Sequence, residues 1–284
     1  MRRLTVRDYV LTRLFIYGLV VSILGPMLYI ASSSLTDPAH QAERILLFIP
    51  QQATLKNYAS AFEYAANTLN VPVWRMFLNS SIYTVFSILI SLVLSTAAAF
   101  GFANHAFRGK EILFLLILST MTIPLQSLLI PLFLLLKRLD LLNTYLALIL
   151  PYAAIGLPFS TLLLRGFFEA LPRELRDAAR IDGASDFGYF WRVVLPLSIA
   201  PLATCVIFLF LTFWNEFLLA LVMIQSDKLA PLTLTLSRIV KARAPQPLPV
   251  YAAIILIGAV PILAVFILLQ RWFVRGIAAG AIKG

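Results

Sequence analysis

The sequence predicts an all-α membrane protein with six transmembrane helices. Three observations lead to this fold class: 61% of the residues are hydrophobic, only 13% are charged, and the mean hydropathy is +0.90. Charged residues make up about a quarter of an ordinary soluble domain, so this chain belongs in a bilayer. Six runs of the sequence contain no Asp, Glu, Lys or Arg, and each is at least as long as the roughly 20 residues that a helix needs to cross a hydrocarbon core.

The six charge-free runs contain between 23 and 32 residues each and are 14–36, 76–107, 112–136, 141–164, 193–215 and 244–270. From these runs we place the spans at about 14–34, 78–103, 112–136, 143–165, 194–222 and 250–272. Because the number of spans is even, both termini lie on the same side. Termini placed inside give 14 Lys and Arg residues in the inner segments and 9 in the outer ones, so the positive-inside rule favours cytoplasmic termini.

The chain is accordingly divided into three parts. Residues 1–13 form a short basic anchor on the cytoplasmic side, residues 14–273 form the transmembrane domain with the loop 166–192 inside it, and residues 274–284 form a cytoplasmic tail. A basic start followed by an apolar run is also typical of a signal peptide. The first charge-free run, however, is longer than the roughly 7–15 apolar residues of a signal peptide, so we interpret it as an uncleaved span.

The spans and outer segments differ in composition. The outer segment 37–75 mixes polar and aromatic residues, and 225–249 is expected to be an extended loop because it is rich in proline. The second span is dense in Ser, Ala and Gly, which let helices approach closely in lipid, so we expect it inside the bundle. Prolines within several spans, such as Pro124, Pro151 and Pro261, favour bent helices.

The most polar stretch lies between the fourth and fifth spans, at 165–192. Pro172 suits the first turn of a helix and Gly183 suits the left-handed residue just past its end, so a helix is predicted over Pro172–Ile181. Ser185 can cap a second short helix that runs to Trp191 and is closed by Leu195-Pro196. On the first helix Leu171, Leu175, Ala178 and Ala179 form one narrow apolar stripe between charged positions. The segment therefore has the form of a helix pair that docks on another protein.

The fifth span carries an acidic residue, Glu216, beside Trp214 and Asn215. Asn215 lies 18 residues beyond Leu197, or about 27 Å along a helix, which places the group near the outer end of the span. Two interpretations are open for Trp214, Asn215 and Glu216. They are candidates for a pore or gate, or they belong to an ordinary belt of aromatic and polar residues at the outer interface.

Several kinds of chemistry find no support in the sequence. The net charge of +10 is dispersed among the loops rather than gathered with aromatic residues, which argues against nucleic-acid binding. The single cysteine, Cys205, cannot form an internal disulfide, and no set of His and Cys suggests a metal site. No glycine-rich phosphate loop is present, so we expect that the chain is not an enzyme, holds no cofactor of its own and does not hydrolyse ATP.

Together, several of these residues resemble a known family. Asp177-Ala178-Ala179, then Asp182-Gly183-Ala184, Phe190 and Leu195-Pro196, are similar to the Glu-Ala-Ala loop of the permease subunits of bacterial binding-protein-dependent ABC importers, in the carbohydrate-uptake branch typified by maltose permease. The signature's Glu is Asp177 here, which keeps the charge on a shorter side chain. Trp214-Asn215-Glu216-Phe217 resembles the family's Trp-Asn-acid-Phe signature. The segment from Thr54 to Phe62 is similar to the family's first outer loop, although an interfacial helix without a partner fits its spacing equally well.

The resemblance implies a function and a set of partners. It implies a pore-forming subunit of an ATP-driven importer for sugars or related carbohydrates in the bacterial inner membrane, with ATP bound by separate ATPase subunits. The implied partners are a second permease subunit in a heterodimer, an ATPase dimer and an extracytoplasmic substrate-binding protein. It also implies that the loop is a cytoplasmic coupling helix pair in a groove of the ATPase, contacting it through Glu174, Leu175, Asp177, Ala178, Ala179, Asp182, Gly183 and Ala184. The tail would then reach towards the ATPase dimer.

Two other functions fit the sequence less well. A self-sufficient secondary transporter or channel usually has ionisable residues near the middle of the bilayer and related halves, whereas here one acid lies near the edge of a span and no repeat is evident. A membrane enzyme acting on lipid-linked substrates requires clustered His, Asp or Glu at an interface. The acids between Glu174 and Asp186 are instead interspersed with arginines along a short helix.

Overall fold

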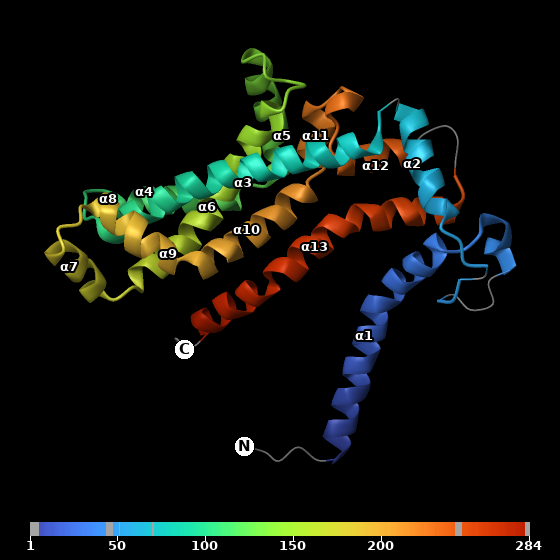
Figure 1. The fold of residues 1–284 in the computed structure, drawn as a ribbon. Coiled ribbons are helices and arrows are strands. Elements are labelled where there is room, and N and C mark those ends of the chain that lie inside the picture. Colours follow the sequence, from blue (N-terminus) through green and yellow to red (C-terminus); the bar gives the residue numbers. More distant parts are fainter. Residues whose placement is uncertain (1–5, 44–47, 51, 70, 242–245, 282–284) are drawn as a thin grey trace. The chain divides into compact units, whose positions relative to one another are not determined.

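The structure of the chain is a computed structural model, and it describes residues 6–43, 48–50, 52–69, 71–241 and 246–281. The described residues are predominantly helical (Figure 1), and the β-type pairing among them is a single isolated bridge between Thr36 and Ala53. This confirms the predicted all-α class. The chain divides into two compact units, which we describe separately: residues 1–73 with 236–260, and residues 74–235 with 261–284.

The first unit is built around the end of its first helix. Its helices up to residue 69 are α1 (Val6–Ser34), η1 (Pro38–Glu43) and α2 (Lys56–Leu69). The side-chain amide of Asn57 donates to the backbone carbonyls of Ser34 and Thr36, each at 2.8 Å, and the Ser34 hydroxyl lies 2.9 Å from that of Tyr58. Carbonyls at a helix end have no partner within the helix. Asn57 therefore links the start of α2 to the end of α1 through hydrogen bonds. This role was not evident from the mixed composition of the outer segment 37–75.

The second unit contains the long helices that pack on one another. Its elements, the last two of which also reach into the first unit, are α3 (Val73–Asn104), α4 (Lys110–Ser119), η2 (Thr120–Thr122), α5 (Leu125–Arg138), α6 (Leu146–Glu169), α7 (Arg173–Ile181), α8 (Asp186–Tyr189), η3 (Phe190–Val194), α9 (Leu195–Leu197), α10 (Ile199–Trp214), α11 (Leu218–Met223), η4 (Asp227–Leu229), α12 (Leu232–Val240) and α13 (Leu248–Ala281). Ser87, Ser91 and Ser95 of α3 are fully buried. The face of α3 that carries the small residues is therefore packed inside the bundle, as predicted, whereas Val85, Leu89 and Val93 are exposed in the single chain.

The packing of α3, α6 and α10 is tightest around Gly156 of α6. A Cβ atom at this position would lie 2.6 Å from Leu209 of α10, 2.8 Å from the Ser91 hydroxyl of α3 and 2.9 Å from Phe213 of α10. Contacts this short cannot be accommodated without displacing a neighbour. The absence of a side chain at Gly156 is what allows the three helices to approach one another.

Four helices are long and apolar enough to cross a membrane by themselves, and two bent pairs bring the number to as many as six. The single helices are Leu11–Ser34, Val73–Asn104, Leu146–Glu169 and Leu248–Leu268. The bent pairs are Lys110–Thr122 with Leu125–Arg138, at 102°, and Asp186–Leu197 with Ile199–Trp214, at 72°. The apolar segments lie where they were expected, and the bends in the third and fifth segments agree with the bent helices that prolines in the spans favoured.

The break between α4 and α5 follows from Pro124. A residue that precedes proline is driven out of the helical conformation, and Ile123 is extended, with φ −78° and ψ 118°. Ser119, Thr120 and Thr122 donate their hydroxyls to the carbonyls of Leu116, Ile117 and Ser119, at 2.7 to 2.8 Å. These bonds satisfy part of the backbone at the broken turn, whose residues 119–124 are exposed in this single chain. Pro131, Pro151, Pro158 and Pro261 lie inside continuous helices.

The later part of the chain also departs from the prediction. The segment 225–249 was expected to be an extended loop, but it contains α12, on which Leu232, Thr235 and Ile239 are buried at helical spacing. Helix α13 continues to Ala281, beyond the expected start of the tail at residue 274. The last three residues of that predicted tail, and the first five of the predicted anchor, lie outside the described residues.

Candidate functional site

The helix pair α7–α8 has well-defined ends. Helix α7 covers Arg173–Ile181 and follows the extended Pro172, and Gly183 has the left-handed φ of 78°. The amide of Ala184 donates to Ala179 O at 2.9 Å, and that of Gly183 donates to Arg180 O at 3.0 Å. This hydrogen-bond pattern is the Schellman motif, which glycine favours at its left-handed position. The predicted helix and the predicted role of Gly183 as its terminator are confirmed.

The helical stretch that begins with α8 (Asp186–Tyr189) continues beyond the predicted end at Trp191, through η3 and α9. The hydroxyl of Ser185 accepts a hydrogen bond from the amide of Gly188 at 3.1 Å and so caps α8, as expected. After α8 the chain forms a π-helical turn over Phe190–Val194 and continues as α9. The expectation that Leu195-Pro196 closes the helix is therefore wrong. Pro196 lies in the first turn of α9, where its missing N–H is tolerated, and the chain bends afterwards, at Ser198.

The apolar stripe of α7 faces its own chain. Ala179 is 8% exposed, and Leu171 and Leu175 pack against a buried cluster of Phe100, Phe168, Tyr189, Val194 and four other residues. The sequence predicts the whole stripe as a surface for a partner, but in the structure Leu175 and Ala179 pack on the core of their own chain. Both are covered by α3, α6 and α8, because small and branched apolar side chains gain more from burial in the nearest core. Ala178, at the edge of the stripe, is exposed.

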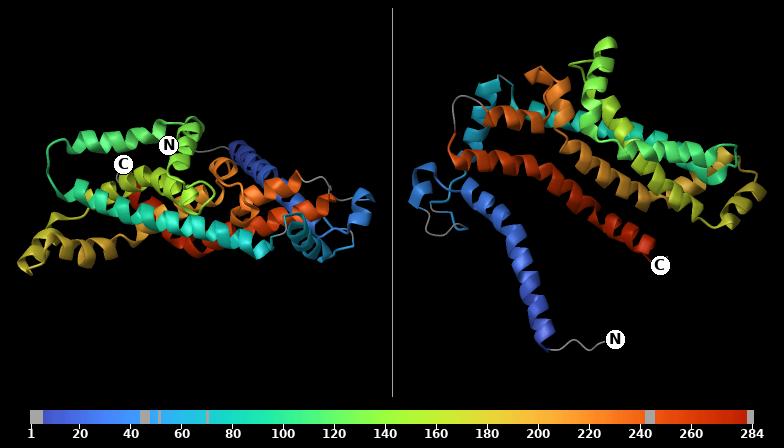
Figure 2. Two further views of the ribbon diagram at one scale, coloured as in Figure 1. Left: turned by 90° about the horizontal axis from the view of Figure 1, so that it is seen from above. Right: turned by 180° about the vertical axis from the view of Figure 1, so that it is seen from behind.

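The opposite face of α7 is open. Ile181 is 87% exposed, and Glu174, Asp177 and Asp182 are exposed as well. Within the described part of the chain these three acids form no ion pair. Both views of Figure 2 show α7 beyond the C-terminal end of α3, where one of its faces is directed away from the bundle. Eight residues of this segment are predicted from the sequence to contact the ATPase. Four of them position the open face of α7: Leu175, Ala179, Gly183 and Ala184. The other four form part of that face: Glu174, Asp177, Ala178 and Asp182.

Basic residues surround the carboxylate of Asp186 on α8. Its Oδ1 lies 3.4 Å from Arg176 Nη2 and 3.9 Å from Arg180 Nη2, and its Oδ2 lies 4.0 Å from His105 Nε2. Arg176 also donates through Nη1 to the backbone carbonyl of Asn104, at 2.8 Å. Burial raises the pKa of the neighbouring Tyr189 phenol, although Arg176 opposes this shift. These contacts join α7 and α8 to the turn that follows α3.

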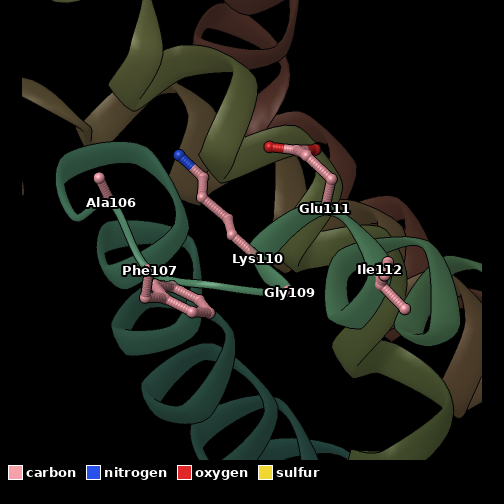
Figure 3. A pocket seen from close by; sticks show the side chains of 6 residues that line it. All are labelled: Ala106, Phe107, Gly109, Lys110, Glu111 and Ile112. Atoms are coloured by element: carbon pink, nitrogen blue, oxygen red, sulfur yellow. The ribbon is translucent and has the colours of Figure 1, made fainter.

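Two open pockets flank this turn. The larger, of about 720 Å³, is lined by residues of α7, of the end of α3 and of the end of α6, including His105, Arg176 and Tyr189. The smaller, of about 430 Å³, is lined by residues 106–107 and 109–112. Figure 3 shows Lys110 and Glu111 directed to one side of the turn and Ile112 to the other. Glu111 binds the guanidinium of Arg165 on α6 through both oxygens, at 2.7 and 3.0 Å, and this hydrogen bonding lowers the pKa of Glu111.

The second predicted site, Trp214, Asn215 and Glu216, lies at the end of α10. Glu216 Oε1 accepts the amide of Leu219 at 2.8 Å, and Oε2 accepts the amide of Ala220 at 3.3 Å and the hydroxyl of Tyr152 at 2.7 Å. The carboxylate therefore caps α11 and ties it to α6, a contact that the sequence did not indicate. Tyr152 stacks on Phe213, with ring centroids 5.3 Å apart. Glu216 thus lies at a junction of three helices.

Its two neighbours lie in different surroundings. Trp214 is 5% exposed and stacks on Phe210, with centroids 5.2 Å apart. Asn215 is exposed and donates to Leu211 O of its own helix at 2.8 Å. The structure does not bring the three side chains together into one site. Of the three, Asn215 is the residue whose side chain is exposed in the single chain.

Comparison with known proteins shows the family to which the chain belongs. Residues 87–279 match the family described as binding-protein-dependent transport system inner membrane component, and this segment includes the α7–α8 pair and Glu216. The chain belongs to this family of transport permeases. It is an inner membrane component with several spans, as its apolar helices require.

Individual proteins that are similar to this chain are also named as permeases. The osmoprotective compounds uptake permease protein GgtD of Synechocystis sp. is 39% identical over 73% of this permease and 70% of that protein. The sulfoquinovosyl glycerol transport system permease protein SmoH of Agrobacterium fabrum is 34% identical over 94% of this permease and 91% of that protein. A solved structure of a bacterial ABC transporter involved in the import of the acidic polysaccharide alginate contains a chain of the same fold, with a TM-score of 0.84, 23% identity and coverage of 96% and 100%.

The permease has one further polar site that sequence reasoning missed. Asn79 of α3 is fully buried, and its amide donates to the carbonyls of Lys228 and Ala230, each at 3.0 Å. Its side-chain oxygen accepts the hydroxyl of Tyr145 at 2.8 Å. Tyr83 donates to Leu229 O, and Ser80 accepts the amide of Leu232. A signal was present, since Asn79, Ser80 and Tyr83 lie on one helical face, but the partners are backbone groups about 150 residues away.

The described residues of the permease contain no group of three or more His, Cys, Asp or Glu side chains that could hold a metal ion. Asp186 is held by cations of its own chain, and Glu216 by donors of its own chain. The chemistry available at both sites is therefore that of positioning helices and of binding another protein.

Proposed function

We propose that this permease forms half of a translocation pore for sugars or related carbohydrates. Transport through the pore is driven by separate ATPase subunits that bind the α7–α8 pair. The observation that carries this proposal is the two-sided character of α7. One face, with Leu175 and Ala179, is packed on the core, and the other presents Ile181 at 87% exposure beside acids without ion pairs in the described structure. A short helix that is packed on one side and exposed on the other can transmit a displacement from a bound partner to the helix bundle.

The proposed topology has six spans, counting each bent pair as one, with both termini and α7–α8 on the cytoplasmic side. The excess of Lys and Arg in the segments placed inside supports this orientation. The broken turn between α4 and α5 supports a pore built with a second permease subunit. Irregular backbone at membrane depth is tolerated where it is covered by protein or lines a water-filled cavity, and residues 119–124 are exposed in the single chain.

The proposal assigns ATP to the partner subunits and gives this chain no catalytic role. The sequence lacks a phosphate-binding loop, and membership of the family supports dependence on an ATPase dimer and on an extracytoplasmic binding protein. The carbohydrate class rests on the resemblance of the α7–α8 segment to the carbohydrate-uptake branch and on SmoH, which is named for a sugar derivative. The role of Glu216 in this proposal is to hold the end of the pore helix α10 against α11 and α6.

The test compares two glycines with the same backbone conformation. Gly183 and Gly109 have φ of 78° and 82°, and a Cβ at either would meet nothing within 4 Å, so valine imposes a similar local cost of roughly 1 kcal/mol or more at each. We expect Gly183→Val to insert in the membrane but to lose ATP-driven uptake and co-purification of the ATPase, because the Schellman turn that aims α7 is lost. Gly109→Val, outside the helix pair, should retain both.

The measurement uses proteoliposomes that contain both permease subunits and the ATPase, supplied with binding protein and labelled sugar. The permease without its ATPase is the blank for ATP hydrolysis. Normal uptake and ATPase binding in Gly183→Val would contradict the proposal, as would equal losses in the two valine variants.

A further inference from the structure

Arg176 connects the α7–α8 pair to the long helix α3. Its Nη1 donates to the carbonyl of Asn104, the last residue of α3, at 2.8 Å, and its Nη2 contacts Asp186 Oδ1 on α8 at 3.4 Å. The side chain is 23% exposed, and its buried Nε has no hydrogen-bond partner in the described structure. Among the described residues of α7, Arg176 is the one whose side chain hydrogen-bonds outside the helix pair.

Helix dipoles favour the positions of both groups that Arg176 contacts, Asn104 O and the Asp186 carboxylate. Asn104 O is among the last carbonyls of α3, which have no partner within the helix and carry the negative end of its dipole. Asp186 lies in the first turn of α8, the positive end of that helix. A guanidinium can bind the two groups at once because its nitrogens lie in a fixed plane, whereas a lysine ammonium is a single point charge.

The neighbouring charged groups do not duplicate the link. Arg180 and His105 also approach Asp186, at 3.9 and 4.0 Å, but within the described residues neither side chain hydrogen-bonds a backbone carbonyl of α3. The open pocket of about 720 Å³ lies beside Arg176, so on that side the space between α7 and the end of α3 is not filled by packed side chains. Packing of Leu175 and Ala179 holds α7 on the core, and Arg176 adds a directional bond to α3.

We propose that Arg176 is a positioning residue for transport, which passes displacement of α7 to the end of α3. At the far end of α3, Asn79 and Tyr83 bind the segment 228–230 that follows α11. A displacement at Asn104 therefore reaches, along one continuous helix of 32 residues, a segment at the opposite end of the unit. The inference rests on the proposed role of α7–α8 in coupling, and it names the residue through which that coupling enters α3.

The experiment measures sugar transported per ATP hydrolysed by the complete reconstituted complex. In Arg176→Met we expect the ATPase to co-purify and to hydrolyse ATP, while transport per ATP falls about tenfold, the effect of losing one charge-assisted hydrogen bond. Arg176→Lys keeps the charge but not the two-point contact, so its transport per ATP should be intermediate. Asp186→Asn should cause a smaller loss in the Arg176→Met background than in the wild type, because its contact with Arg176 is already absent there.

The matched control is Arg108→Met. Arg108 is exposed in the turn after α3 and has no ion pair in the described structure, so transport per ATP should be unchanged. Wild-type transport per ATP in Arg176→Met would overturn the inference. If that variant does not accumulate in the membrane, Arg176→Lys decides, and a wild-type ratio there would overturn it. Either result leaves the Gly183→Val test intact, whereas failure of that test would remove the proposed function itself.

Discussion

The two ends of α3 are held in different ways. At its N-terminal end Asn79 is fully buried, is neutral, and binds two backbone carbonyls at 3.0 Å each. At its C-terminal end the Arg176 guanidinium donates to Asn104 O at 2.8 Å and contacts Asp186 at 3.4 Å, and the two side chains are 23% and 43% exposed. Buried amide hydrogen bonds are costly to break because the freed groups find no water, whereas at the partly exposed end water can replace a contact that is lost. One end of the helix is thus fixed, and the other can change partners.

The largest change in the free energy of unfolding is expected at the N-terminal end of α3. Asn79→Leu leaves the carbonyls of Lys228 and Ala230 and the Tyr145 hydroxyl without the partner they have now, so we expect the free energy of unfolding to fall by about 2–4 kcal/mol. Asn104→Leu is the matched control at the other end, because the Asn104 amide donates a single bond to Phe100 O of its own helix, at 3.3 Å. Thermal unfolding in detergent measures both variants. Equal destabilisation would show that the two ends do not differ.

A smaller effect is expected at Glu216. Glu216→Gln exchanges the charged acceptor of the Tyr152 and Leu219 bonds for a neutral one, so we expect a loss of about 1–2 kcal/mol and altered transport with normal insertion. Asn215→Ala removes a bond within one exposed helix turn and should change stability by less than about 0.5 kcal/mol. Unfolding and uptake are measured in parallel. Unchanged uptake in both variants would favour the interface-belt interpretation of these residues.

The smallest effect concerns Glu111, near the exchangeable end of α3. Hydrogen bonds from Arg165 lower the pKa of Glu111, so its contribution to stability is present above the ordinary carboxyl pKa and is lost as pH falls through the lowered value. Wild type and Glu111→Gln should therefore differ slightly in unfolding temperature at pH 7 and converge in acid. Glu63→Gln, an exposed acid on α2, is the control and should show no such convergence. A gap that widens in acid would contradict the assignment.

Sequence reasoning succeeded where the cause is local. Charge-free runs located the apolar segments, and Pro172, Gly183 and Ser185 fixed the ends of α7 and α8, because capping depends on a few consecutive residues. The bend at Pro124 was also expected from the sequence. The rule on the residue before proline applies to every proline in a helix, however, and Pro131, Pro151 and Pro158 leave their helices continuous. Local sequence did not distinguish these cases.

The candidate site was less predictable because its contacts join distant segments. The stripe of Leu175 and Ala179 was located correctly, but its partner was not, since an apolar face has the same pattern whether it packs on its own core or on another protein. Arg176 is one of several charged residues beside the stripe, and its acceptor is a backbone carbonyl, which has no sequence signature. Glu216 was singled out, whereas Tyr152, which donates to it from another helix, was not.

The broken turn at residues 119–124 has a consequence for the life of the protein in the cell. A chain that inserts alone leaves this polar backbone open to lipid or to any other protein in the bilayer. Membrane proteases and chaperones act on such incompletely satisfied segments, so surplus copies are expected to be removed until a partner covers them. The amount of this permease that accumulates should then follow the supply of the second permease subunit that we propose rather than the rate of its own synthesis.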